Sequence, residues 1–134
     1  MFERSPILLA EDCDEDILFF RKVLERAKIS NPLRVVPDGE HVIAYLQGTG
    51  AYADRAEFPL PNLLALDLKI PILDGFQVLT WIKGKPALAW IWLLVLTGEG
   101  SVVEVARAYE LGADSVWVKS TDLDGLGELI RLNA

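Results

Sequence analysis

Residues 63–75 of this 134-residue chain are Leu63-Leu64-Ala65-Leu66-Asp67-Leu68-Lys69-Ile70-Pro71-Ile72-Leu73-Asp74-Gly75. The first four residues are an uninterrupted apolar run, and the fifth is Asp67. A short apolar run followed by turn residues, here Pro71 and Asp74-Gly75, is typical of a strand buried on both faces. We therefore expect a parallel strand over 63–66 that presents Asp67 at its carboxyl end.

The same kind of segment recurs on both sides of this strand. Four further short strands are expected over 7–10, 33–36, 91–96 and 115–118. Helical spacing of apolar residues, with turn and capping residues at the ends, predicts helices over 14–28, 39–47, 76–83, 101–111 and 123–132. Strands that alternate with helices favour an α/β fold, in which a parallel sheet carries helices on both faces.

The domain organisation is expected to be simple. The segment 48–61 is rich in Gly, Pro and Ala with mixed charge, so we expect a long surface loop there. No internal repeat and no linker is visible in the sequence. We expect residues 1–134 to form a single domain with no output domain attached.

The composition narrows the function classes. The chain has 13 Lys and Arg against 20 Asp and Glu, a net charge of −7, which argues against binding to nucleic acid or to anionic membranes. The single cysteine, Cys13, cannot form an internal disulfide, and the N-terminus lacks the pattern of a secretion signal. No apolar stretch approaches membrane-spanning length. We therefore expect a cytoplasmic protein.

Polar side chains follow four of the five expected strands. Glu11 and Asp12 follow the first strand, Asp67 the third, Thr97 the fourth and Lys119 the last. Ligands of doubly wound sheets bind outside the carboxyl ends of the strands. We therefore expect these residues, which are far apart in the sequence, to converge on one site.

The chemistry of these residues suits phosphoryl transfer. Three carboxylates in one site repel each other unless a cation compensates them, and their oxygen atoms are ligands that suit Mg²⁺. The metal and the Lys119 ammonium would neutralise a transferring phosphoryl group, and the Thr97 hydroxyl would donate to another of its oxygens. A carboxylate is a suitable nucleophile for forming an acyl phosphate, and Asp67 is the central candidate.

With these residues at its strand ends, the chain resembles response regulator receiver domains over essentially its whole length. Any one of the matching segments is a weak signal, but their order and spacing together are specific. They are Ile7-Leu8-Leu9-Ala10-Glu11-Asp12, Leu66 to Gly75, Val95-Leu96-Thr97, Glu110-Leu111-Gly112-Ala113 and Val118-Lys119.

The resemblance implies a fold and a set of roles. The fold would be the flavodoxin-like (βα)5 arrangement, a doubly wound parallel sheet with strand order 2-1-3-4-5. Asp67 would accept phosphate from a sensor histidine kinase, with Lys119 and Thr97 in contact with the phosphoryl group. Glu11, Asp12, Asp67 and the main-chain carbonyl of Lys69 would hold Mg²⁺.

The resemblance also implies partners. The loop 48–61 is similar to that of regulators partnered with bacterial phytochromes, so the kinase would be of that kind. A downstream protein target or a phosphotransfer protein would receive the signal. Val102, Val103 and Val105 leave their expected helix rather apolar, which favours a homodimer through that region.

The sequence departs from the receiver pattern at several positions. Val116 stands where receivers usually carry Tyr or Phe, and its neighbour Trp117 should point to the opposite face of the sheet. Ser120 replaces a common proline, and we expect a trans peptide bond before it. Lys69 and Glu99 are expected to pair across the site and to slow hydrolysis of the acyl phosphate.

Two other functions are weighed against this one. Haloacid-dehalogenase-type phosphatases also use a strand-end Asp and Mg²⁺, but they resemble each other in a second Asp two positions on, where this chain has Lys69. We therefore expect no enzymatic turnover of an outside substrate, only phosphorylation and dephosphorylation of the chain's own aspartate. A receiver-like interaction domain that no longer accepts phosphate stays open, because Val116 departs from the usual switch residue.

Three tryptophans and two glycines outside the site lead to predictions about packing. Trp81, Trp90 and Trp92 should gather at the sheet end opposite the site, either as packing of the rim or as an exposed patch for a partner. Gly125 and Gly127 weaken the last helix, and we hypothesise that they make room for Trp117 beneath it.

Overall fold

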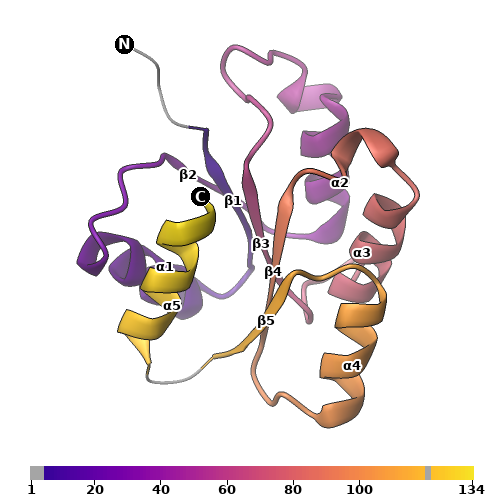
Figure 1. Ribbon diagram of the computed structural model, residues 1–134. Helices are drawn as coiled ribbons and strands as arrows, with labels where there is room; N and C mark the ends of the chain where they lie inside the picture. Colours follow the sequence, from indigo (N-terminus) through magenta and orange to yellow (C-terminus); the bar gives the residue numbers. More distant parts are fainter. Residues whose placement is uncertain (1–4, 120–121) are drawn as a thin grey trace.

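A computed structural model describes residues 5–119 and 122–134 of the chain. The expected alternation of strands and helices is confirmed along these residues (Figure 1). The strands are β1 (Ile7–Ala10), β2 (Leu33–Val36), β3 (Leu63–Asp67), β4 (Trp92–Thr97) and β5 (Ser115–Val118). The helices are α1 (Asp14–Arg26), α2 (Gly39–Gln47), α3 (Gly75–Lys83), α4 (Val102–Glu110) and α5 (Leu123–Asn133), with short 3₁₀ turns η1 (Gly50–Tyr52) and η2 (Pro86–Leu88).

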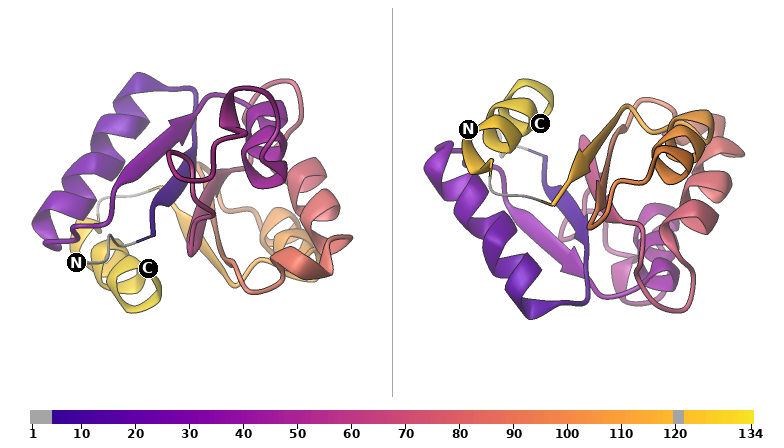
Figure 2. Two further views of the ribbon diagram at one scale, coloured as in Figure 1. Left: turned by 90° about the horizontal axis from the view of Figure 1, so that it is seen from above. Right: turned by 90° about the horizontal axis from the view of Figure 1, so that it is seen from below.

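All strand pairings in the sheet are parallel, and the strand order is β2-β1-β3-β4-β5. The two views of Figure 2 show α1 and α5 together on one face of the sheet and α2, α3 and α4 on the other. This is the doubly wound arrangement that was expected. The peptide bond before Ser120 lies outside the described residues.

The core has two halves because successive side chains of a strand point to opposite faces. Leu64 and Leu66 of β3 face the cluster covered by α2, α3 and α4, whereas Leu63 and Ala65 face α1 and α5. All four side chains are buried, which explains why this strand is apolar at every position rather than at alternate positions.

Strand register sets the position of the polar residues. Ala10 pairs with Leu66, so Glu11 and Asp67 follow at the same level on neighbouring strands. Thr97 pairs with Val118, and the Lys119 amide donates to the Thr97 carbonyl at 2.7 Å. The four strand ends therefore lie at one edge of the sheet.

The segment 48–61 is more ordered than the simple surface loop we expected. It contains the turn η1, and the rings of Tyr52 and Phe58 pack against Tyr45 of α2. The Arg55 guanidinium donates to the Tyr45 and Leu46 carbonyls at 2.8 Å each, and to the Phe58 carbonyl at 3.1 Å. Arg55 thus satisfies carbonyl groups at the end of α2, where helices leave acceptors unpaired, and ties the segment to that helix.

The tryptophans do not form the single cluster that was expected. Trp81 packs against the core half under α2, α3 and α4, and Trp92 packs against the half under α1 and α5. Trp90 is 54% exposed, and its indole donates to the Ala87 carbonyl. Proximity in the sequence was misleading here because the sheet separates Trp81 from Trp92.

The two residues before the end of β5 also face opposite sides of the sheet, as expected. Val116 packs in the half covered by α2, α3 and α4, and Trp117 packs in the other half beside α5. The hypothesis that the α5 glycines make room for Trp117 is wrong. A Cβ on Gly127 would lie 2.9 Å from the Cβ of Ala27, so this glycine permits close packing of α5 on the C-terminal end of α1.

Candidate functional site at the carboxyl edge of the sheet

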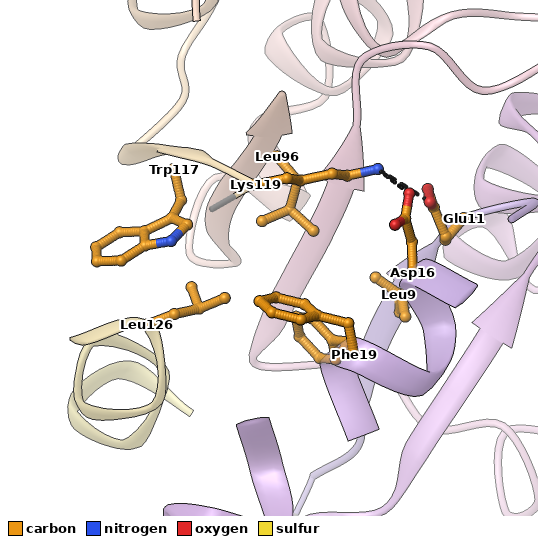
Figure 3. Close-up of a pocket in the computed structure, with 9 residues that line it drawn as sticks. Leu9, Glu11, Asp16, Phe19, Leu96, Trp117, Lys119 and Leu126 are labelled. Carbon is orange, nitrogen blue, oxygen red and sulfur yellow. Dashed lines mark hydrogen bonds and ion pairs between the residues drawn. The ribbon is translucent and has the colours of Figure 1, made fainter. Parts of the chain in front are cut away.

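The ammonium of Lys119 is the centre of the site. It donates to Oδ2 of Asp67 at 2.5 Å, to Oδ2 of Asp16 at 2.7 Å and to Oε1 of Glu11 at 3.0 Å. Figure 3 shows the Lys119 side chain extending from the end of β5 to the carboxylates of Glu11 and Asp16. Of the predicted site residues, the structure joins Glu11, Asp67 and Lys119 by direct contacts.

Glu11 is buried in a crowd of like charges. Its side chain is only 1% exposed, and the neighbouring carboxylates belong to Asp67 and Asp16. Burial, reinforced by these carboxylates, raises the pKa of Glu11 to about 9. Without further positive charge, the ionised form of Glu11 is therefore disfavoured.

Asp67 is held in its ionised form. Burial acts to raise its pKa, but the hydrogen bonds with Glu11, Lys119 and the Lys69 amide outweigh burial and lower the pKa. The Lys69 amide donates to Oδ1 of Asp67 at 2.9 Å, so both carboxylate oxygens have a donor. Burial likewise acts to lower the pKa of Lys119, but its three carboxylate partners raise it, and the ammonium stays charged.

The donor set fits a hard divalent cation. Oε2 of Glu11 is buried and has no hydrogen-bond partner among the described residues. Glu11, Asp16 and Asp67 are three carboxylates in contact with one ammonium, an imbalance that an ion with oxygen ligands would correct. Asp12 is exposed at the end of β1 beside Glu11.

The remaining predicted residues border this centre. Thr97 is buried at the end of β4, and its hydroxyl accepts a 3.4 Å hydrogen bond from the Gly100 amide. Lys69 lies in the turn that follows Asp67. Its ammonium lies 3.9 Å from Oε1 of Glu99, so the expected pairing of these two side chains is confirmed.

Asp16 is the residue that sequence reasoning missed. An acidic residue in the first turn of a helix is ordinarily explained by favourable electrostatics at the helix N-terminus, yet the side chain of Asp16 reaches Lys119. Hydrogen bonding with Glu11 and Lys119 outweighs burial and lowers the pKa of Asp16. The available signal was its place in the first turn of the helix that follows the acidic strand end.

Comparison with known proteins shows the family to which the chain belongs. The model of the response regulator receiver domain family matches residues 7–131. Response regulator Rcp1 of Synechocystis sp. is 36% identical over 125 residues, which cover 93% of this chain and 83% of Rcp1. The crystal structure of the Mn²⁺-bound form of Rcp1 has a TM-score of 0.80 at 35% identity, covering 95% of this chain and 89% of that one.

Two further solved structures are similar over nearly the whole chain. Response regulator RPA3017, described in red light signalling of R. palustris, has a TM-score of 0.86 at 34% identity and covers 96% of this chain and 90% of its own. The phosphorylated cyanobacterial phytochrome response regulator RcpA has a TM-score of 0.82 at 30% identity, with 96% and 89% covered. This chain belongs to the response regulator receiver domain family, and it is a response regulator of two-component signalling.

Proposed function

We propose that this chain is a cytoplasmic phosphorylation switch in which Asp67 accepts a phosphoryl group from a sensor histidine kinase. The observation that carries the proposal is the Lys119 ammonium, which bonds Asp67 and Glu11 from two neighbouring strand ends. Receiver domains of this family are phosphorylated on an aspartate. Asp67 is the candidate because it is buried, ionised and bonded through both oxygens.

Asp67, Lys119 and Thr97 would each have a separate role in the transfer of the phosphoryl group. A carboxylate oxygen of Asp67 would attack the phosphorus of the kinase phosphohistidine, the P–N bond would break, and the histidine would retain that electron pair and take up a proton. Lys119 would hold the phosphoryl oxygens from one side, and the Thr97 hydroxyl would donate from the end of β4.

Receiver domains bind a divalent metal ion, and we propose Mg²⁺ for this chain. Glu11, Asp12, Asp67 and the Lys69 carbonyl would hold it. The ion would supply the positive charge that stabilises the transferring phosphoryl group. The Oε2 atom of Glu11, which no described residue hydrogen-bonds, supports this assignment.

The proposed partners follow from the relatives. Rcp1 and RPA3017 are response regulators, and RcpA is described as a cyanobacterial phytochrome response regulator, so we propose a phytochrome-type histidine kinase as the phosphate donor. The signal would pass to a downstream protein or phosphotransfer protein. Val102 and Val103 of α4 are 85% and 77% exposed, which supports self-association through this helix.

Intact-mass measurement after treatment with acetyl phosphate tests the function. We expect one phosphoryl group per chain in Mg²⁺ buffer, and a rate of uptake that falls by about 100-fold when the metal is chelated, since several kcal/mol of charge stabilisation is lost. Addition of excess Mg²⁺ to the chelated sample should restore the rate. Absence of phosphoryl uptake in Mg²⁺ buffer would instead favour a receiver-like interaction domain that does not use phosphate.

The Lys69–Glu99 pair is expected to lengthen the lifetime of the acyl phosphate. The two side chains are 65% and 77% exposed, so their coupling is worth at most about 1 kcal/mol. Lys69→Ala or Glu99→Ala should therefore speed hydrolysis by about two- to fivefold, and the double variant should add little. Decay of the phosphorylated mass in the four proteins measures this, and independent effects of the two substitutions would rule out the pair as the cause.

A further inference from the structure

Besides Glu11 and Asp67, a third carboxylate contacts the phosphate-site lysine, and it comes from a helix rather than from a strand end. Asp16 belongs to the first turn of α1, and its Oδ2 lies 2.7 Å from Nζ of Lys119 (Figure 3). The lysine side chain is 20% exposed and that of Asp16 is 39% exposed, so the pair is partly shielded from water. Such a pair holds a geometry better than an ion pair that is fully exposed.

The three contacts of Lys119 use all of its donors. A lysine ammonium has three N–H groups, and Lys119 directs them to Glu11, Asp16 and Asp67. In the proposed function, Glu11 and Asp67 become ligands of the metal, and Asp67 becomes the phosphorylated group. Two of the three bonds must therefore change during the cycle, and only the bond to Asp16 involves a residue with neither role.

We propose that Asp16 is a positioning residue that anchors the Lys119 ammonium while Glu11 and Asp67 exchange partners. This inference rests on the proposed function of Asp67 and deepens it. With one N–H group fixed on Asp16, the other two remain directed toward the place where phosphoryl oxygens arrive. The anchor also ties the end of β5 to α1, so the lysine position depends on both elements.

The surroundings of Lys119 explain why an anchor is needed. A narrow cavity of about 10 Å³ borders the Lys119 side chain and is lined chiefly by apolar groups such as Leu96, Phe19 and Trp117. These apolar walls, drawn in Figure 3, carry no charge that would hold the ammonium, and the charged residues that line the cavity beside Lys119 are Glu11 and Asp16. A lysine has a long flexible stem, so the loss of Asp16 would allow it to move away from the reacting oxygens.

If Asp16 were a metal ligand rather than an anchor, the same measurement would give a different result. Ligand atoms of Glu11, Cys13 and Asp16 lie within 4.8 Å of one another, so Asp16 could be a metal ligand instead. A metal ligand sets the Mg²⁺ concentration needed for half-maximal rate, whereas an anchor of Lys119 sets the rate at saturating Mg²⁺. The two roles are therefore separable in one titration.

The test is the rate of phosphoryl uptake from acetyl phosphate as a function of Mg²⁺ concentration. Asp16→Ala should lower the rate at saturating Mg²⁺ by about tenfold, since misplacement of a catalytic group by even 1 Å is costly. The Mg²⁺ concentration that gives half of the maximal rate should stay within about twofold of the wild-type value, because an anchor of Lys119 does not bind the ion. Asp16→Asn keeps an acceptor oxygen and should fall between Asp16→Ala and wild type.

Asp14→Asn is the matched control, because it removes the same charge from an exposed position in the same helical turn. Equal saturating rates in Asp14→Asn and Asp16→Ala, or a shift only in the Mg²⁺ requirement, would overturn the anchor role. If wild type itself takes up no phosphoryl group, the proposed function fails, and a second measurement decides the anchor by itself.

That second measurement is ¹⁵N NMR of the lysine ammonium groups in Mg²⁺ buffer without acetyl phosphate. A Lys119 ammonium held by Asp16 should give a signal with slowed hydrogen exchange in wild type and in Asp14→Asn. The signal should broaden beyond detection in Asp16→Ala. A Lys119 signal that is the same in wild type and Asp16→Ala, whether sharp or absent, would contradict the proposal without reference to phosphorylation.

Discussion

Asp67→Asn is expected to lower phosphoryl uptake from acetyl phosphate by at least about a thousandfold at saturating Mg²⁺. The side-chain amide is neutral and its nitrogen lone pair is delocalised, so it cannot replace the carboxylate as a nucleophile. The substitution preserves the shape of the side chain, and the remaining carbonyl oxygen can still accept from Lys119 or from the Lys69 amide. The loss should therefore come from the chemistry rather than from misfolding.

Intact mass against time measures this effect, with Asp54→Asn as the control. Asp54 is an exposed aspartate in the segment 48–61, and its substitution should leave the rate unchanged. An unfolding midpoint of Asp67→Asn close to that of wild type would establish that the fold is intact. Undiminished phosphoryl uptake by Asp67→Asn would place the acceptor elsewhere, and the exposed Asp12 would be the first residue to substitute next.

The strand ends could be predicted from the sequence because their physical signal is local. Each of the central strands β1, β3 and β4 is a short, largely buried apolar run, and a polar or charged residue such as Asp67 marks the point where the apolar run ends. Parallel connections then bring all carboxyl ends to one edge, so Glu11, Asp67 and Lys119 had to meet there. No knowledge of side-chain packing was needed for that step.

Other features depend on contacts that a linear pattern does not record. Whether Asp16 faces Lys119 or solvent depends on the rotation of α1 about its own axis, which packing against the sheet and α5 decides. Gly127 is needed because Ala27 lies against it, one hundred residues earlier in the chain. Trp81 and Trp92 were expected together, but a sheet runs between them. In each case the deciding partner comes from a distant element.

The closely spaced carboxylates that suit the site for a metal ion should also destabilise the folded protein when no metal is present. Glu11→Gln is expected to raise the free energy of unfolding of the metal-free protein by about 2 kcal/mol at pH 7. The amide is neutral, its oxygen can accept from Lys119, and its nitrogen can donate to the neighbouring carboxylates. A buried group that fits the site only in its neutral form is thus replaced by one that is always neutral.

The direction of this pH dependence follows from proton binding to Glu11 in the folded and unfolded states. In the folded wild type, Glu11 keeps its proton up to about pH 9, whereas in the unfolded chain it loses it near its ordinary value of 4.5. The folded state binds the extra proton between these values, so this group makes the wild type less stable as pH rises from about 4.5 to about 9. Glu11→Gln lacks this dependence, and its advantage over wild type should therefore grow with pH across that window.

Urea unfolding with EDTA at pH 5, 6, 7 and 8 measures the effect. Glu15→Gln is the control, because Glu15 is an exposed glutamate in the first turn of α1, only four residues after Glu11. Saturating Mg²⁺ should narrow or reverse the difference, because the ion binds the folded wild type through the carboxylate that the variant has lost. If Glu11→Gln and wild type keep a constant difference from pH 5 to 8, Glu11 is not held neutral by its surroundings. The crowding of carboxylates would then not be the reason that this site requires a cation.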